Sequence, residues 1–596
     1  MIEKPSRVGK ATKKGTGLTE LPVEILQSIC GHLCLHCQTP HAVDVPYSLV
    51  HTALLNQRAL SSLSRTCGHL RAIAQPVLFH LYLSDSSYCV PGEIPDDDGD
   101  ERIFRADLFN VCHHFHERHR AALFLRTLLE RGDLAACVCA LTLHQAPWNP
   151  SVQLDRRGDI EVSRLRQLGN GLVAEVVTQG TQRVLVGSLD GHLAKTRGNM
   201  NDTLERVQEL IVVLSASSLE QLCIERTMFL DELVNMPYDW RSWSYHLPRL
   251  EYLAFLDQRV PGANTYYYKE AHGLVSSAPN LRKLVLPDCH AHPERWMAHQ
   301  FRNVPWDVSL KFLVKLSVSG IRRNHLRTIL AGCPVLEDLE YFCQDTGFDD
   351  DILCPEEDLS VVRGTLRRLC YSIHPANINS GSEPELDILD EDYYPSWAAM
   401  TALKILEIQR VLLYGTSQDN LGDEADQGQS HDEQDQTETD FSSGQMTHPD
   451  SNGGTPEDDV GENNQQPLPA QRSQETLKMN MTAPEDFMSR LPQTLETLRI
   501  GRIVSWPAMY RDAVALAKAA PDRFPYLRRL YLEMHNVCPP QDEIAALVGI
   551  FTKTNITCLV RPGVDRKIGR SSHGFSLDSS VQINLLMSAD DLGAQM

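Results

Sequence analysis

The chain contains 596 residues with a formal net charge of −22, 42% hydrophobic residues and 16 cysteines. The hydrophobic content is ordinary for globular proteins and excludes global disorder, and the length allows several domains or one long repeat array. An acidic chain is repelled by phosphate backbones and anionic lipids, so we expect neither nucleic acid nor membrane as a generic partner. So few cysteines do not make a disulfide scaffold and are typical of reduced intracellular thiols.

The N-terminal residues 1–17 are polar and basic, and we predict a flexible arm. Two interpretations stay open for it, a targeting signal and an ordinary solvated tail. It has no apolar segment of the kind found in secretory signals, and the sequence has no run of about 18 apolar residues. We therefore expect an intracellular protein, located in the cytoplasm, the nucleus or both.

Two helical patterns follow the arm. The first begins near Leu21 and Pro22, and its apolar residues recur with helical spacing through Ile25, Leu26 and Ile29. The second covers 60–81, where Pro76 predicts a kink or a restart and hence at least two helices. The intervening residues 34–59 are predicted to form a surface insertion, which would cost little loop entropy.

A repeated unit dominates the chain from residue 138 onward. It has the form apolar-x-x-Leu-x-apolar, and most successive units start about 30 residues apart. The Leu-x-apolar pair predicts a short strand that directs two side chains inward, and such units must stack to bury their apolar edges. The alternative is a set of unrelated strands in a conventional α/β domain. The ten units begin at Val138, Leu219, Leu250, Leu281, Leu313, Leu336, Leu366, Leu403, Leu495 and Leu527.

One long gap between units has a different composition. Residues 416–470 contain fourteen acidic residues and neither Lys nor Arg. Such a segment buries too little apolar surface to offset its chain entropy, so we predict a disordered acidic insertion over 415–482. A regulatory role and a tolerated insertion are both consistent with this composition.

The two N-terminal helical segments together resemble an F-box. The first carries LPVEIL over 21–26, and the second carries LSSLSRTCGHLRAIAQPVLF over 60–79, with an apolar-Pro-apolar step near its end. An F-box in front of degenerate leucine-rich units is similar to the architecture of filamentous-fungal F-box proteins. The chain departs from the family pattern at 34–59, where the family has only a few residues.

This resemblance implies that the helices dock on the Skp-type adaptor of a cullin–RING ubiquitin ligase. Internal packing of the helices is the alternative role for the same residues, and the sequence leaves both open. The residues matched to adaptor contacts are Leu21, Pro22, Ile25, Leu26, Leu63, Leu70, Ile73 and Pro76.

The resemblance also implies that the leucine-rich units hold a protein substrate, whose identity the sequence does not give. Several predicted strands carry basic residues at outward positions, and such a column would bind an acidic or phosphorylated segment. Ordinary solvated strand residues are the alternative. The basic residues are Lys283, Lys315, Arg368, Arg499 and Arg529.

A metal site was weighed at the cysteine-rich segment that follows the first helical pattern. Cys34 and Cys37 form a C-x-x-C pair, with Cys30 before it and His41 after it. A structural zinc site needs four ligands, and no second pair follows at the usual spacing. We therefore predict no metal, no cofactor and no catalytic residue.

The sequence thus predicts an α/β protein in which a small all-helical F-box precedes a leucine-rich-repeat solenoid. Its expected role is substrate recognition in a ubiquitin ligase, and a ligase-independent interaction scaffold is the alternative. The predicted segments are a basic arm (1–17), an F-box (18–83), a helical linker (84–135), a repeat array (136–414), an acidic insertion (415–482), the continued array (483–561) and a C-terminal tail (562–596).

Overall fold

A computed structural model describes most of the predicted folded parts of the chain. The predicted basic arm (except Gly17), the acidic insertion and the C-terminal tail lie outside the described residues. The described residues are 17–39, 47–83, 120–145, 179, 182, 203–227, 245–258, 268–286, 308–319, 323–344, 353, 355–374, 396–409, 484–503, 505–534 and 538–561.

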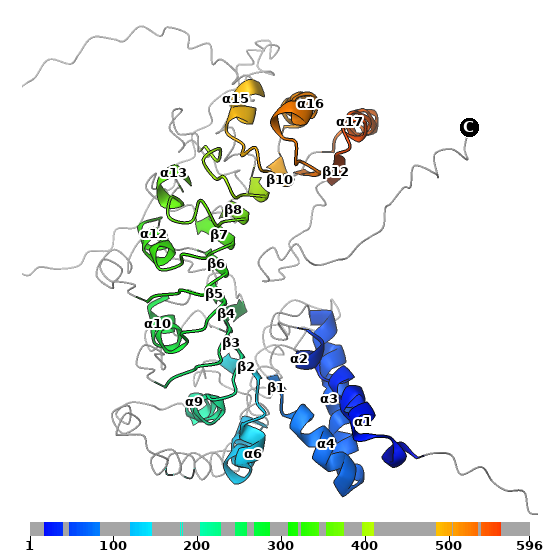
Figure 1. Cartoon of the computed structure of the whole chain (residues 1–596), viewed down its shortest axis with the longest axis vertical. Coiled ribbons are helices and arrows are strands. Elements are labelled where there is room, and N and C mark those ends of the chain that lie inside the picture. Colours follow the sequence, from blue (N-terminus) through cyan, green and yellow to red (C-terminus); the bar gives the residue numbers. More distant parts are fainter. Residues whose placement is uncertain are drawn as a thin grey trace, which may run out of the picture.

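Twelve parallel strands form one sheet, and their order in space is their order in the sequence. Figure 1 shows them stacked one above another from β1 to β12, in a mixed α/β, solenoid-like arrangement. The strands are β1 (Leu81–Leu83), β2 (Ala140–Gln145), β3 (Gln221–Thr227), β4 (Tyr252–Gln258), β5 (Lys283–Leu286), β6 (Lys315–Ser319), β7 (Asp338–Gln344), β8 (Arg368–His374), β9 (Ile405–Gln409), β10 (Thr497–Ile503), β11 (Arg529–Met534) and β12 (Thr557–Arg561).

Helices lie on both sides of the strand stack. Those between the strands cover one side, and the first four helices lie on the other side, beside the first strands (Figure 1). Residues 120–130 are also helical. The helices are η1 (Leu18–Glu20), α1 (Val23–His32), α2 (Leu35–Gln38), α3 (Tyr47–Thr66), α4 (Gly68–Leu78), α6 (Gly132–Ala135), α9 (Thr203–Ser215), α10 (Tyr268–Ser277), α12 (Arg323–Ala331), α13 (Pro355–Asp358), α15 (Pro484–Ser489), α16 (Trp506–Arg523) and α17 (Gln541–Lys553).

The ten predicted repeat units are the strands β2–β11, so the stacked strand pattern is confirmed. The first apolar residue of each Leu-x-apolar pair lies opposite its counterpart in the next strand, as Leu316 does with Leu339 and Leu339 with Leu369. All three are fully buried. Because side chains alternate along a strand, this register places every leucine of the row in the core beneath the helices. The strands β1 and β12 were not predicted.

The lead-in to several strands is hydrogen-bonded to the end of a neighbouring helical segment. The Leu310 N–H donates to the carbonyl of Gly332 at 2.9 Å, and the Leu247 N–H donates to that of Ser277 at 2.8 Å. At Gly332 a Cβ atom would lie 2.8 Å from the Val308 carbonyl oxygen, so only glycine allows this close approach. These bonds fix the spacing between each strand and the helix beside it.

The first helices form a helical module (residues 18–80) with a core of its own. Leu26 and Cys30 of α1 pack with Leu60 of α3 and Leu70 of α4. The two helices expected in 60–81 are present, as α3 and α4, but no helix restarts at Pro76, because α4 continues through it to Leu78. The break between helices lies at Cys67, whose sulfur accepts a hydrogen bond from the Leu70 N–H and caps α4. Of the described helices, none is long and apolar enough to span a membrane.

The described residues of 34–59, which are 34–39 and 47–59, do not form a surface insertion. Residues 35–38 form α2 and residues 47–59 extend α3 toward its N-terminus. Leu35 and Ala53 are buried against outward-facing residues of the first strands, including Ala140, Tyr252 and Ala254. We call this contact the junction. It attaches the helical module to the face of β1–β4 opposite the helices.

Candidate functional site

The structure places the residues matched to adaptor contacts in three environments. Leu26, Leu70 and Ile73 are 2%, 5% and 9% exposed and belong to the core of the helical module. Of the two roles that the sequence left open, these three residues therefore serve internal packing. Leu21, Leu63 and Pro76 are half-buried, whereas Pro22 and Ile25 are exposed.

An exposed apolar face lies around the start of α1. Ile25 is 48% exposed, and Ile29, one turn later, is 36% exposed. Ile25 and Ile29 are neighbours on the helix surface, because residues four apart share a face. Together with Pro22, which directly precedes the helix, they form what we call the α1 face, an apolar surface suited to contact with a partner protein. Val23 is also exposed, at 41%, but it lies on the other side of the buried stripe of α1.

The α1 face contains a residue that the sequence analysis did not match to an adaptor contact. Ile29 was missed because the apolar spacing did not separate the core face of α1 from its exposed face. Ile25 and Ile29 each directly precede a buried residue of the core, Leu26 or Cys30. A helix with apolar residues on both sides of its buried stripe is the signal that could have found them.

The predicted basic column is largely paired with carboxylates. Arg368 on β8 lies 2.6 Å from Glu340 and 3.0 Å from Asp338 on β7, and 3.2 Å from Glu407 on β9. Lys315 on β6 lies 2.8 Å from Glu340. Lys315 and Arg368 are therefore already paired, because adjacent strands supply opposite charges at the same outward positions.

The other predicted basic residues differ from one another. Lys283 is buried, with its ammonium 4.8 Å from the centre of the Tyr252 ring. Arg499 lies 3.4 Å from Glu407 and stacks 4.9 Å above the Tyr531 ring. Arg529 is exposed. The five residues thus share one face of the sheet but do not form one binding site for an anion.

The charges on β6–β10 form a continuous network, which we call the charged ladder. It comprises Lys315, Asp338, Glu340, Arg368, Glu407 and Arg499. Burial opposes ionisation of Glu340, but Lys315 and Arg368 outweigh it and lower the pKa of Glu340 to about 2. At Asp338 burial dominates and raises the pKa. The network is therefore ionised and internally matched near neutral pH.

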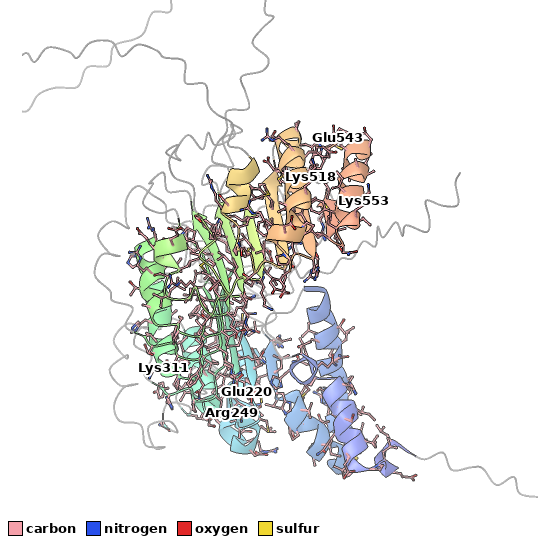
Figure 2. The ribbon with its side chains drawn as sticks, turned by 45° about the horizontal axis from the view of Figure 1, so that its top comes forward. Glu220, Arg249, Lys311, Lys518, Glu543 and Lys553 are labelled. Carbon is pink, nitrogen blue, oxygen red and sulfur yellow. The ribbon has the colours of Figure 1, made fainter. Side chains whose placement is uncertain are left out.

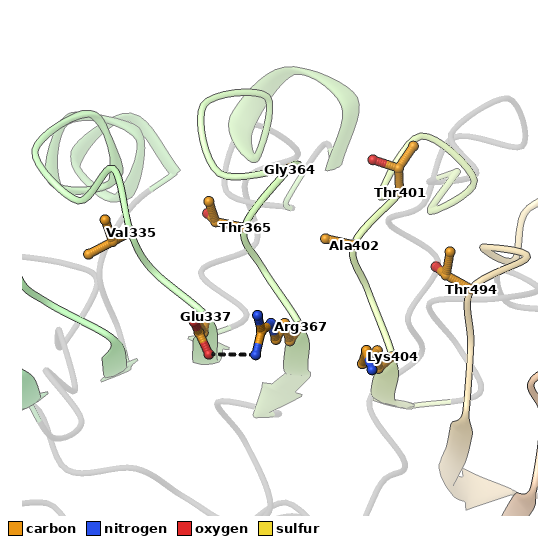
Figure 3. A pocket seen from close by; sticks show the side chains of 9 residues that line it. All are labelled: Val335, Glu337, Gly364, Thr365, Arg367, Thr401, Ala402, Lys404 and Thr494. Atoms are coloured by element: carbon orange, nitrogen blue, oxygen red, sulfur yellow. Dashed lines mark ion pairs between the residues drawn. The ribbon is translucent and has the colours of Figure 1, made fainter.

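A shallow hollow of about 410 Å³ lies beside the charged ladder, where the chain enters β7–β10. Figure 3 shows its lining residues on successive lead-in segments, with an ion pair between Glu337 and Arg367. The two side chains approach to 3.3 Å. Its mixture of small polar and charged side chains suits contact with a peptide more than enclosure of a small molecule.

A cluster of metal-binding side chains lies at the junction. The ligand atoms of Cys34, His36, Cys37 and His80 are all within 4.8 Å of one another. Glu220 approaches His36 at 3.5 Å and also pairs with Arg249. Figure 2 shows Glu220 and Arg249 close together near the end of the array beside the helical module. The sequence analysis missed His80 because it lies 43 residues after Cys37.

No protein-family model matches the chain, and no curated protein matches it.

Proposed function

We propose that the protein is a substrate-recognition subunit of a cullin–RING ubiquitin ligase of the SCF type. In this proposal the helical module is an F-box that binds a Skp-type adaptor, and the leucine-rich array binds a protein substrate. The chain performs no catalysis and needs no cofactor. It acts by raising the effective concentration of substrate lysines near the ubiquitin-charged enzyme.

The observation that carries the proposal is the α1 face. Pro22 and Ile25, both matched to the F-box pattern, project outward together with Ile29, while Leu26 and Cys30 of the same helix belong to the module core. Burial of these apolar side chains against a partner protein would be favourable, because it removes apolar surface from water. The helical module is also joined to the array through the junction, so that a partner on α1 and a partner on the array would be held in fixed relation.

Substrate capture is proposed for the open part of the strand face, at the charged ladder and the adjacent hollow. Since Arg368 and Lys315 are already paired, an incoming acidic segment would have to replace Glu340 or Asp338 as their partner. A segment carrying charges of both signs would match the ladder better than a purely acidic one. This differs from the expectation drawn from the basic residues alone.

The adaptor test uses exposed rather than buried residues. The full chain is co-expressed with the Skp-type adaptor and analysed by size-exclusion chromatography, as wild type and as Ile25→Asp/Ile29→Asp. We expect the wild type to co-elute with the adaptor and the double variant to lose binding, because two carboxylates would be buried in an apolar interface. Leu55→Asp is the matched control, since Leu55 is an equally exposed apolar residue of the module, on α3.

A folded wild type that fails to co-elute with the adaptor would overturn the proposal and support the ligase-independent scaffold. Retention of adaptor by Ile25→Asp/Ile29→Asp would instead show that the α1 face is not the docking surface. Leu26→Asp does not distinguish these outcomes. Leu26 is 2% exposed in the module core, so this variant is expected to unfold the module.

A further inference from the structure

The cluster at the junction has the composition and dimensions of a structural metal site. Two thiols and two imidazoles converge, and their ligand atoms lie within 4.8 Å of one another. Around a tetrahedral zinc ion with bonds of about 2.0–2.3 Å, ligand atoms are about 3.3–3.8 Å apart. The Cys37 sulfur is already 3.3 Å from Nδ1 of His80. The remaining separations therefore need only small side-chain adjustments.

His36 presents a buried nitrogen without a hydrogen-bond partner. Its Nε2 faces Oε2 of Glu220 at 3.5 Å, and its Nδ1 is buried and unpaired among the residues that the structure describes. A buried polar atom without a partner is costly, and a metal ion would remove that cost. A histidine that contacts a carboxylate through one nitrogen and a metal through the other is the usual arrangement in zinc sites.

The backbone holds the four side chains in place without a ligand. Cys34 precedes α2 and Cys37 lies within it, and the Cys37 N–H donates to the Cys34 carbonyl at 3.1 Å. His80 lies just before β1, and its carbonyl accepts hydrogen bonds from the N–H groups of Cys139 and Ala140. The ligands are thus contributed by the helical module and by the point where its chain enters the sheet.

The nearby Cys139 is not one of the four residues of the cluster. Its thiol donates a hydrogen bond to the Cys137 carbonyl at 3.4 Å.

We propose that Cys34, His36, Cys37 and His80 bind one structural Zn²⁺ ion, with Glu220 as the outer partner of His36. Four protein ligands leave no open coordination position, which is typical of structural rather than catalytic zinc. The ion would bind the helical module to the start of the array. This inference does not depend on the proposed ligase function.

The test measures zinc in the full chain, expressed with zinc and purified under reducing conditions, by inductively coupled plasma mass spectrometry. We expect one Zn²⁺ per chain in the wild type and a loss of at least about tenfold in Cys34→Ser/Cys37→Ser and in His80→Ala. Cys538→Ser and His69→Ala are matched controls, since both residues are exposed and lie outside the cluster. Glu220→Gln is expected to weaken zinc binding about tenfold and leave one equivalent at saturation.

Two further measurements do not depend on the folding of a variant. Cobalt added to the metal-free wild type should give the visible absorption of tetrahedral Co²⁺ with thiolate-to-metal charge transfer. A chelator should lower the Tm of the wild type to that of Cys34→Ser/Cys37→Ser and leave the Tm of that variant unchanged.

Three results would overturn the proposal. The first is a folded wild type that contains no zinc and gives no cobalt spectrum. The second is stoichiometric zinc that persists in Cys34→Ser/Cys37→Ser, because the metal would then lie elsewhere among the 16 cysteines. The third is a Cys34–Cys37 disulfide, found by alkylation and mass spectrometry, in a protein whose reduced form does not bind zinc, which would make the pair a redox dithiol.

Discussion

The strand face opposite the helices has two halves that share one backbone arrangement and differ in chemistry. On β1–β4 the outward residues are mostly apolar and lie under the helical module, as Leu81, Ala140 and Ala254 do. On β6–β10, which we call the open half, the same positions carry the charged ladder, whose side chains are 11–27% exposed and lie beyond the helical module. The register continues unbroken between them, from Ala254 through Val285 to Ser317 and Glu340.

This difference shows which positions the fold constrains. The inward positions are apolar in both halves, because each strand must bury its leucines beneath the helices. The residue type at each outward position depends only on whether another part of the protein or solvent faces it. The first half became apolar where the helical module covers it, and the second half stayed charged, so the array can change its exposed surface without changing its core.

The largest effect is expected from a charge placed in the covered half. Ala254→Arg puts a guanidinium into the junction, where Ala254 is fully buried, and should lower the free energy of unfolding by about 4 kcal/mol. Ser317→Arg is the matched change in the open half, because Ser317 is also an outward residue and lies opposite Glu340. This variant should change the free energy of unfolding by less than about 0.5 kcal/mol. Urea unfolding measures both. Equal effects would contradict the division into covered and open halves.

A smaller effect is expected from breaking the charged ladder. Arg368→Ala leaves Asp338, Glu340 and Glu407 close together without their shared cation and should cost about 2 kcal/mol, because the site is partly buried. Arg529→Ala, on the same face but exposed, should change stability by less than about 0.5 kcal/mol. An Arg368→Ala variant as stable as wild type in urea would show that the ladder contributes nothing to stability.

Acidification should weaken the open half through Glu340. Because its folded-state pKa is lowered to about 2 from the ordinary value of 4.5, its ionised form stabilises the fold above about pH 4.5, and this contribution is lost as the pH falls toward 2. Burial raises the pKa of Asp338, which acts in the opposite direction and offsets part of the loss. Glu340→Gln should therefore lose less stability than wild type between about pH 5 and about pH 3. Urea midpoints at both pH values test this, and an identical loss in the two proteins would contradict it.

The smallest effect is expected from shortening the connection within the open half. Strands β9 and β10 pair in register although residues 410–496 separate them in the sequence. Deletion of 416–470 shortens the loop that must close and should stabilise the array by about 1 kcal/mol or less. Differential scanning calorimetry of the deleted and full chains measures this change. A large loss of stability would show that the removed residues pack on the array.

The sequence predicted the array well because its signal is periodic. Each of β2–β11 carries the Leu-x-apolar pair, and the stacking of such pairs follows from burial alone. The pattern missed β1 because Leu81 continues the helical spacing of Leu78 and because Tyr82 takes the place of the first leucine. It missed β12 because Cys558 takes that place. Short strands of this kind are defined by pairing with a neighbour rather than by their own residues.

The candidate sites were harder to predict because they depend on contacts between distant segments. The sequence showed basic and acidic residues at outward strand positions, but the pairing of Lys315 and Arg368 with Glu340 depends on the register of three strands. Leu35 and Ala53 looked like part of an insertion until the face that they cover was known. His80 joined Cys34 and Cys37 only through the folding of the helical module.

The in-register stack also fixes lengths within the molecule. Neighbouring strands are about 4.8 Å apart, so the six steps from β1 to β7 span about 29 Å along the sheet. The strand β1 directly follows the helical module. The distance along the sheet from the module to any strand of the open face is therefore a whole number of strand spacings. Insertion or removal of one repeat would change that reach by one strand spacing and leave both surfaces intact.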